Sequence, residues 1–457
     1  MEAFSALVNT VDSFMWGPWL LILLVGTGVF LTFRLGFLQF THLGYALKLA
    51  FSPAKQDRTS EGDISHFAAL MTALAATIGT GNIVGVATAF VLGGPGAVFW
   101  MWITALFGMA TKYGEAVLSI KYRVTDAKGE MAGGPMFYIE KGLGWKWMAV
   151  LFAFFGSVAA FGIGNLVQAN SVAGNMSATF GISPVITGLV LAVFTAIVIL
   201  GGVKSIGRWS SIIVPFMAVF YILGGLYIIF TNLGLLGPAF AVIFTSAFSA
   251  KAGFAALIGT TIRYGVARGL FSNEAGMGSA PIAAAAAKTD HPCRQGLVSM
   301  TGTFLDTIVV CSITGLALVM ASLSGFLPTA PDASALTSQS FQHFIPFGSV
   351  IVTIALLFFA YSTVLGWSYY GEKCFYYLVG QKGILPYRIA FCILVYVGAV
   401  AKLDLVWNIA DAFNAAMAVP NLIALLLLSG VIAAETKDFK RIRLEEKASE
   451  KGLKEAS

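Results

Sequence analysis

Two glycine-rich polar stretches interrupt long apolar segments of the chain, and both have the composition of a ligand-binding site. Residues 77–82 are Thr-Ile-Gly-Thr-Gly-Asn, and residues 271–278 are Phe-Ser-Asn-Glu-Ala-Gly-Met-Gly. Glycine tolerates non-helical backbone angles, so both stretches are expected to break a helix. A break leaves backbone N–H and C=O groups without helical partners, and these groups can bind a small solute or a cation.

The composition places these breaks within transmembrane helices. Of the 457 residues, 58% are apolar and only 11% are charged, whereas a soluble domain carries about 25% charged residues. No Asp, Glu, Lys or Arg occurs in residues 67–111, 147–203 or 209–250. Crossing the hydrocarbon layer takes roughly 20 apolar residues, and continuous apolar runs favour helices over a barrel. The sequence predicts an all-α polytopic membrane protein.

Apolar runs separated by charged loops predict eleven transmembrane helices. The two breaks fall in the second and seventh of them, and because five is an odd number, the two halves have opposite orientations. Two such breaks at matching positions indicate an inverted-repeat transporter with a binding site near the middle of the membrane. The expected spans are residues 15–34, 66–91, 95–118, 147–175, 183–203, 209–231, 253–287, 296–324, 346–371, 386–402 and 406–434.

This span pattern divides the chain into four parts. Residues 1–64 form an extra N-terminal span and a cytoplasmic amphipathic segment, 65–232 and 233–434 form the two inverted repeats, and 435–457 form a basic cytoplasmic tail. With the N-terminus outside, most Lys and Arg residues lie on the cytoplasmic side, Lys112 among them. The basic charge therefore belongs to a membrane face and does not indicate nucleic-acid binding. The expected location is the cell membrane.

A family resemblance enters after the second span. Residues 93–108 are Gly-Gly-Pro-Gly-Ala-Val-Phe-Trp-Met-Trp-Ile-Thr-Ala-Leu-Phe-Gly, which resembles the signature of the alanine or glycine:cation symporter family, the sodium:alanine symporters. The resemblance extends over the whole chain, including both breaks. It implies the five-plus-five fold of the amino acid–polyamine–cation superfamily and cotransport of alanine or glycine, usually with Na⁺.

A zwitterionic amino acid needs separate partners for its two charges. A helix that restarts after a break presents free N–H groups and a positive dipole end, which suit a carboxylate; here these are the amides of Gly79, Thr80 and Gly81. The second break offers carbonyl groups to the ammonium. The candidate residues from this break are Phe271, Ser272, Asn273 and Gly276.

Two further side chains complete the expected substrate site. Gln168 is an amide deep in an uncharged span, where it could bond the ligand or a neighbouring helix, while the nearby Asn165 is expected to bond a helix. Phe271 and Trp367 are candidates for limiting the size of the substrate side chain, against the alternative that they only pack. One methylene discriminates by about 1–3 kcal/mol, so the size limit is expected to be graded.

The superfamily resemblance also implies a Na⁺ site between the first broken helix and the third helix of the second repeat. The matching positions are the carbonyls of Ala75 and Ile78 and the hydroxyls of Ser362 and Thr363. Oxygen ligands suit a hard cation, although a serine or threonine hydroxyl in a helix also bonds back to its own helix. The four cysteines lie far apart and form no metal-ligand cluster. No resident cofactor is expected besides Na⁺ as the coupling ion.

Charged residues inside spans are candidates for function. Arg268 and Glu274 are expected to pair as a gate beside the second break, while the roles of Arg263, Asp306 and Asp411 stay open. The sequence leaves open H⁺ in place of Na⁺, exchange in place of symport, another small solute, and the oligomeric state. A channel is disfavoured by the inverted halves of one chain, and no Ser-His or His-rich metal constellation indicates an enzyme.

Overall fold

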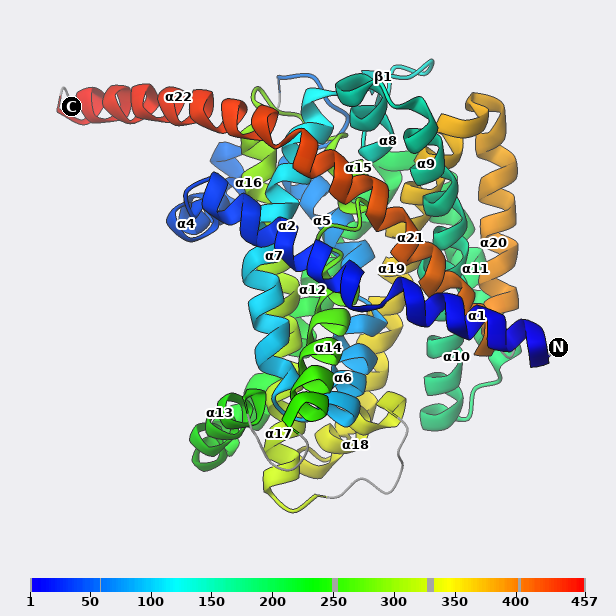
Figure 1. Cartoon of the computed structure of the whole chain (residues 1–457). Coiled ribbons are helices and arrows are strands. Elements are labelled where there is room, and N and C mark those ends of the chain that lie inside the picture. Colours follow the sequence, from blue (N-terminus) through cyan, green and yellow to red (C-terminus); the bar gives the residue numbers. More distant parts are fainter. Residues whose placement is uncertain (1, 58, 249–253, 327–332, 402–403, 456–457) are drawn as a thin grey trace.

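The chain folds into a body of packed α-helices with one short hairpin of strands (Figure 1). A computed structural model describes residues 2–57, 59–248, 254–326, 333–401 and 404–455. Within these ranges, strands β1 (Val124–Thr125) and β2 (Met131–Ala132) pair antiparallel and form the one sheet. The predicted all-α fold is confirmed.

The first predicted repeat opens with a broken helix. α5 (His66–Thr77) ends at Ile78, whose extended ψ of 94° stops the helix. The chain restarts through the π-helix η2 (Gly81–Gly85) into α6 (Val86–Gly93), at an angle of 54° to α5. The helices that follow are α7 (Ala97–Lys121), α9 (Lys146–Phe161), η4 (Gly162–Leu166), α10 (Val167–Phe180), α11 (Pro184–Ile199) and α12 (Gly202–Thr231).

The second predicted repeat also contains a break. Between α14 (Phe254–Asn273) and α15 (Ala280–Ala284), the φ angles of Glu274, Gly276 and Gly278 are 55°, 88° and 81°. A right-handed helix cannot continue through such angles, which glycine adopts most easily. The helices that follow are α16 (Pro292–Thr303), η5 (Phe304–Cys311), α17 (Ser312–Leu323), α19 (Gly348–Val379), α20 (Ile384–Val400) and α21 (Asp404–Leu427).

Several helices lie outside the two repeats or within their loops. α13 and α18 occupy segments that the sequence left as loops, and α22 crosses the predicted boundary at residue 434 without interruption. These remaining elements are α1 (Glu2–Met15), α2 (Pro18–Arg34), α3 (Leu38–Thr41), α4 (Leu43–Phe51), η1 (Pro53–Lys55), α8 (Pro135–Tyr138), η3 (Ile139–Leu143), α13 (Leu233–Ala247), α18 (Ala333–Phe344), η6 (Gln381–Gly383) and α22 (Ser429–Glu455).

The number of spans is supported in part. Length and composition identify 7 described helices that could cross a membrane, or 8 if the bent pair α5–α6 forms one span. The other predicted spans correspond to α7, which carries buried charges, to α11, which has only 16 residues, and to α14 with α15. Eleven spans therefore stay a prediction.

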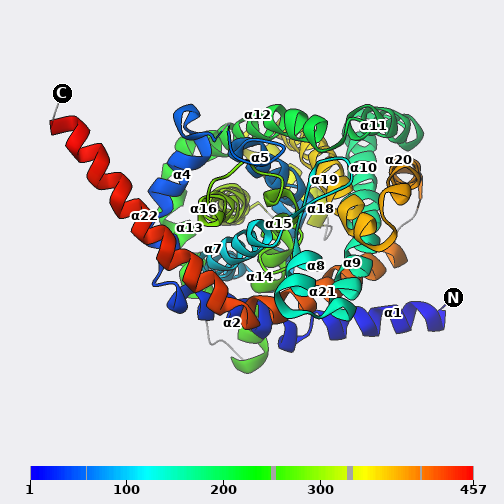
Figure 2. The same cartoon turned by 90° about the horizontal axis from the view of Figure 1, so that it is seen from above.

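The broken helices lie at the centre of the bundle. Viewed from above, α5, α7, α14, α15 and α16 form one group beside α19, while α9, α10, α11 and α20 lie on the other side (Figure 2). α5 packs against α12 and α19, and α14 packs against α6 and α7. Both breaks are thus enclosed by long helices that hold them in place.

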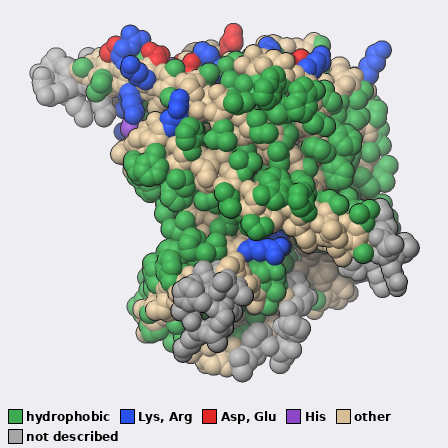
Figure 3. Space-filling view, viewed as in Figure 1, with side chains coloured by type: hydrophobic (Ala, Val, Ile, Leu, Met, Phe, Trp, Pro, Cys, Tyr) green, Lys and Arg blue, Asp and Glu red, His purple; other side chains and the backbone are tan. Residues whose placement is uncertain are grey.

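Charged and apolar side chains separate on the surface. Lys, Arg, Asp and Glu side chains gather along the edge that carries α22, and hydrophobic side chains cover the middle of the face (Figure 3). Large exposed apolar side chains on α11 and α12, such as Ile197, Ile212 and Phe216, are 55–61% exposed. Exposed apolar area of this extent is expected where the surface faces lipid rather than water.

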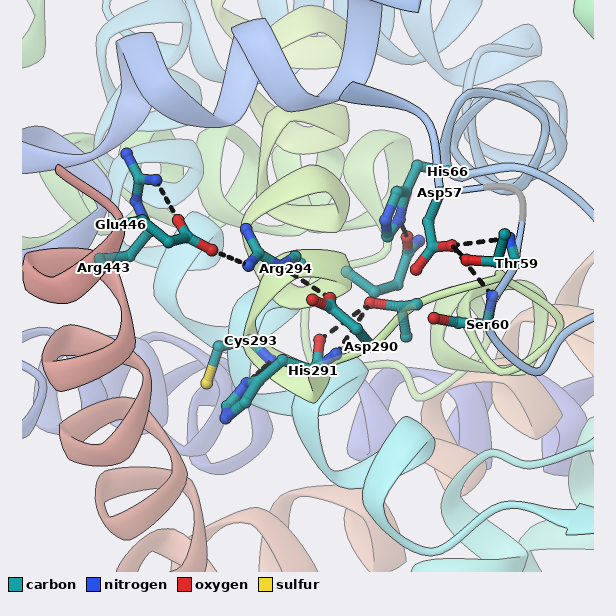
Figure 4. Close-up of polar contacts among 12 residues, drawn as sticks. Asp57, Thr59, Ser60, His66, Asp290, His291, Cys293, Arg294, Arg443 and Glu446 are labelled. Carbon is teal, nitrogen blue, oxygen red and sulfur yellow. Dashed lines mark hydrogen bonds and ion pairs between the residues drawn. The ribbon is translucent and has the colours of Figure 1, made fainter. Parts of the chain in front are cut away.

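A polar network attaches α22 to α16 and α4 at this charged edge, which we call the charged face. Arg294 donates to Asp290 and Glu446 (Figure 4) and, at 3.0 Å, to the Tyr45 hydroxyl of α4. Arg443 also pairs with Glu446. Partial burial acts to raise the pKa of the Glu446 carboxyl, but hydrogen bonds from the two arginines outweigh it and lower the pKa below its usual value. Glu446 is therefore ionised at neutral pH and anchors α22.

Candidate functional site

The backbone amides of the first break are directed at neighbouring side chains. The Gly79 N–H donates to Asn82 Oδ1 at 2.9 Å, and the Thr80 N–H lies 3.4 Å from Gln168 Oε1. Gln168 also donates to the Thr80 hydroxyl at 3.3 Å and to the Ile163 carbonyl at 3.0 Å. Gln168 was expected to bond either the ligand or a neighbouring helix. The first alternative requires it to lie at the break, and the structure places it there. Its amide oxygen occupies a position that suits an oxygen of a carboxylate.

Asn82 belongs to the first break, whereas Asn165 bonds a neighbouring helix. Asn165 donates to the Phe391 carbonyl of α20 at 2.7 Å, which agrees with its expected structural role. Asn82 was not predicted as a site residue, although it follows the glycines directly in sequence. Asparagine often caps a free backbone amide, and this tendency was the signal that could have identified it.

The second break leaves carbonyl groups free. The Ala275 N–H bonds the Asn273 side chain at 3.0 Å, and the Met277 N–H bonds the Glu274 carbonyl at 3.2 Å. In a continuous helix these two N–H groups would bond the carbonyls of Phe271 and Asn273. Those carbonyls have therefore lost their helical partners, as the sequence predicted for an ammonium site.

The two breaks lie against each other. A Cβ atom added to Gly81 would lie 3.1 Å from Ser272 Cα and 3.4 Å from Phe271 Cδ1. A Cβ on Gly79 would lie 2.4 Å from the Thr363 hydroxyl oxygen and 3.4 Å from Gln168 Oε1. Real Cβ atoms essentially never approach another atom to 2.4 Å, so glycine at position 79 lets the backbone reach α19.

The buried carboxylate of Asp306 accepts hydrogen bonds from both breaks. Asp306, in η5, is 0% exposed and accepts hydrogen bonds from Asn82 Nδ2 at 2.7 Å, the Ser272 hydroxyl at 2.9 Å and the Thr307 hydroxyl at 2.7 Å. Cys311 Sγ lies 3.3 Å from both Asn82 Nδ2 and Ser272 Oγ. Sequence reasoning noted Asp306 only as an intramembrane charge, because its partners in the two breaks, Asn82 and Ser272, lie more than 30 positions away in the chain.

Trp367 closes another side of the site. It is 1% exposed, and its indole N–H donates to Glu274 Oε1 at 2.9 Å. The other oxygen of Glu274 accepts from the Ser279 hydroxyl. A Cβ on Gly164, in η4, would lie 2.2 Å from Trp367 Cβ, so this glycine allows the indole to pack against the helix.

The expected pairing of Arg268 with Glu274 is wrong. Glu274 bonds Trp367 and Ser279, whereas the Arg268 guanidinium lies over the Phe271 ring at 5.6 Å. The reason is the direction of the chain: α14 is continuous up to Asn273, so Arg268 lies more than one helical turn before the break. Glu274, in the left-handed region, points instead toward α19.

The first break also frees two carbonyl groups on its other side. In a continuous helix the carbonyls of Ala75 and Ile78 would accept from the N–H groups of Gly79 and Asn82. The Gly79 N–H instead bonds the Asn82 side chain, and the Asn82 N–H bonds the Gly79 carbonyl at 3.3 Å. The carbonyls of Ala75 and Ile78 are therefore available to other partners.

The hydroxyls of Ser362 and Thr363 meet these carbonyls. Ser362 Oγ lies 3.2 Å from the Ala75 oxygen, and Thr363 Oγ1 lies 3.4 Å from the Ile78 oxygen. Each hydroxyl also bonds the Phe359 carbonyl of its own helix, at 2.8 and 3.0 Å. The structure thus brings together all four predicted cation ligands. Oxygen ligands suit a hard cation.

The placement of Lys112 in a loop is wrong. It was counted with the basic residues of the cytoplasmic loops, but it lies within α7 and is 3% exposed. Glu115, one turn later, is fully buried and accepts from the Gly278 N–H at 3.0 Å and from Asn421 at 2.7 Å. The charge rule describes loops, so it carries no information about a lysine that is buried among acidic side chains.

The sequence matches known proteins over nearly its whole length. The model of the "Sodium:alanine symporter family" matches residues 1–453. The "Sodium/alanine symporter AgcS" of Methanococcus maripaludis is 68% identical over 449 residues, which are 97% of this chain and 99% of that protein. The "Amino-acid carrier protein AlsT" of Bacillus subtilis is 38% identical over 446 residues, covering 97% and 94% of the two chains.

A solved structure shares the fold. The crystal structure of MhsT in complex with L-phenylalanine superposes with a TM-score of 0.58 over 82% of this chain and 93% of that chain, at 16% sequence identity. At this identity the comparison supports the arrangement of the helices alone. It confirms the predicted fold class.

Proposed function

The chain belongs to the sodium:alanine symporter family, and we propose that it imports alanine or glycine together with Na⁺ by alternating access. The observation that carries the proposal is the first break. Its Thr80 amide is directed at Gln168 and its Gly79 amide at Asn82. Its two free carbonyls are directed at Ser362 and Thr363. One interruption thereby serves an anionic group and a cation at once. Binding of either is coupled to the other through this shared backbone.

The substrate carboxylate is bound at the start of η2. The amides around Gly79, Thr80 and Gly81 carry the positive end of the helix dipole, which favours a carboxylate. Gln168 Oε1 lies 3.4 Å from the Thr80 N–H. A substrate carboxylate oxygen replaces it there, or the Gln168 side chain bonds the substrate. At the second break, the carbonyls near Phe271 and Asn273 accept the ammonium, and Ser272 and Gly276 belong to the same segment.

The bulk of Trp367 and Phe271 selects small side chains. Trp367 is fixed by Glu274 and Gly164, so its indole cannot turn away to admit a larger ligand. Phe271 is held beneath the Arg268 guanidinium. We expect leucine to bind less tightly than alanine by a graded amount, about 1–3 kcal/mol per added methylene.

The membrane arrangement forms part of the proposal. The charged face that carries α22 is cytoplasmic, the N-terminus is outside, and the protein lies in the cell membrane (Figure 3). Residues 65–232 and 233–434 form the inverted repeats. Residues 1–64 and 435–457 flank them.

Uptake into proteoliposomes tests the proposed function. A tenfold inward Na⁺ gradient stores about 1.4 kcal/mol per ion, so radiolabelled alanine should accumulate up to about tenfold for each coupled Na⁺. Replacing Na⁺ by choline should abolish accumulation, and an inward H⁺ gradient alone should not restore it. Accumulation driven by H⁺ would identify a proton-coupled carrier. Uptake that requires alanine inside the vesicles and no ion gradient would identify an exchanger.

A further inference from the structure

A second polar cavity lies beside the substrate site and contains charges that do not bind the substrate in the proposed function. Its volume is 210 Å³, and it is lined by α1, α14 and α21. Asp12 and Asp411 contribute two carboxylates, and Arg263 and Arg268 contribute two guanidinium groups. Phe271, a candidate substrate residue, lines the same cavity, so the two sites share a wall.

The charges in this cavity are not paired with one another. In the described part of the chain, no ion pair joins any of the four residues. Three of their polar atoms are buried without a hydrogen-bond partner: Asp12 Oδ1, Asp411 Oδ1 and Arg268 Nε. Unsatisfied buried polar atoms are rare in native structures and often indicate a missing ligand or water.

The surrounding contacts hold these groups apart. The Trp16 indole, in the turn between α1 and α2, donates to the Asp411 backbone carbonyl of α21 at 3.3 Å. The Arg268 guanidinium lies over the Phe271 ring at 5.6 Å. A carboxylate and a guanidinium are therefore presented to the same space from two different helices.

We propose that this cavity is a second binding site for a small zwitterionic amino acid. The ligand carboxylate bonds Arg268 and Arg263, because a guanidinium offers a planar set of donors that matches a carboxylate. The ligand ammonium bonds Asp411 and Asp12. Such a ligand offers its ammonium to the unpaired oxygens of Asp12 and Asp411 and its carboxylate to Arg268 Nε. A water molecule could bond the same atoms but would not neutralise their charges. The identification of the ligand rests on the proposed function.

The stoichiometry of alanine binding to the purified full-length protein tests this site. By equilibrium dialysis with radiolabelled alanine, the wild type should bind two molecules per chain, and Arg268→Gln and Asp411→Asn should each bind one. The matched control is Asn408→Ala, which removes a hydrogen bond between α21 and Asn9 of α1 without removing a charge from the cavity. It should bind two. Elution as a single species in size-exclusion chromatography checks that each variant is folded.

The outcomes separate the two proposals. One alanine per chain in the wild type, or two in both charge variants, overturns the second site and leaves the proposed function intact. If Asn408→Ala also binds only one alanine, the second site is overturned, because altered packing of α1 would then explain the loss in all three variants. If the folded wild type binds no alanine, the proposed function itself fails.

Discussion

Gly79→Val is expected to lower the affinity for alanine by a hundredfold or more. The added Cβ would lie 2.4 Å from the Thr363 hydroxyl and 3.4 Å from Gln168 Oε1, so the break must shift or the substrate must leave. A charge-assisted hydrogen bond contributes about 1.5–3 kcal/mol, and each 1.4 kcal/mol changes affinity about tenfold. Loss of the Gly79 and Thr80 amides together therefore accounts for the expected loss. Isothermal titration of purified protein with alanine measures it.

Two variants serve as controls for this experiment. Gly85→Ala changes a glycine of the same break, but an added Cβ there meets nothing within 4 Å, so wild-type affinity is expected. Gln168→Ala removes one polar partner of Thr80 and should cost about tenfold or less, as a single hydrogen bond does. If Gly79→Val binds alanine as tightly as the wild type, the carboxylate does not bind at this break.

The double variant Ser362→Ala/Thr363→Ala is expected to abolish the response of alanine binding to Na⁺. It removes two of the four oxygens that converge between α5 and α19, at 3.2 and 3.4 Å from the carbonyls of Ala75 and Ile78. Because linkage is reciprocal, alanine should also lose its effect on Na⁺ binding. Alanine affinity measured at several Na⁺ concentrations should be flat for the variant and should rise with Na⁺ for the wild type.

Ser368→Ala is the matched control on the same helix. The Ser368 hydroxyl is buried and donates to the Leu365 carbonyl of its own helix at 2.7 Å, rather than to a carbonyl of the break. Its removal should leave the Na⁺ response unchanged. An unaltered Na⁺ response in the Ser362→Ala/Thr363→Ala variant would place the cation elsewhere.

The sequence predicted the features that depend on local composition. Glycines inside apolar runs located both breaks, and the family resemblance added the four oxygens of Ala75, Ile78, Ser362 and Thr363, which the structure brings together. Free amides and carbonyls follow from a break wherever it occurs. Such features are therefore visible without knowledge of the tertiary structure.

The features that sequence reasoning missed depend on contacts between distant segments. Asp306 bonds Asn82 across 224 positions, and Trp367 bonds Glu274 across 93. Glu274 is non-glycine in the left-handed region, so its direction could not be read from helical spacing. Lys112 was misplaced because a charge count cannot distinguish a loop lysine from a buried one. The number of spans was only partly supported, since α7 and α11 depart from the length and polarity of a typical span.

Competition by alaninamide is the most direct measurement of the central claim, that the first break binds the carboxylate of a zwitterion. Alaninamide is nearly isosteric with alanine and keeps the ammonium but lacks the negative charge, which a helix N-terminus favours. In uptake of radiolabelled alanine by proteoliposomes with an inward Na⁺ gradient, unlabelled alanine and glycine should inhibit and leucine should inhibit poorly. Alaninamide at the same concentration should not inhibit. If alaninamide competes as well as alanine, no carboxylate is recognised at Gly79, Thr80 and Gly81.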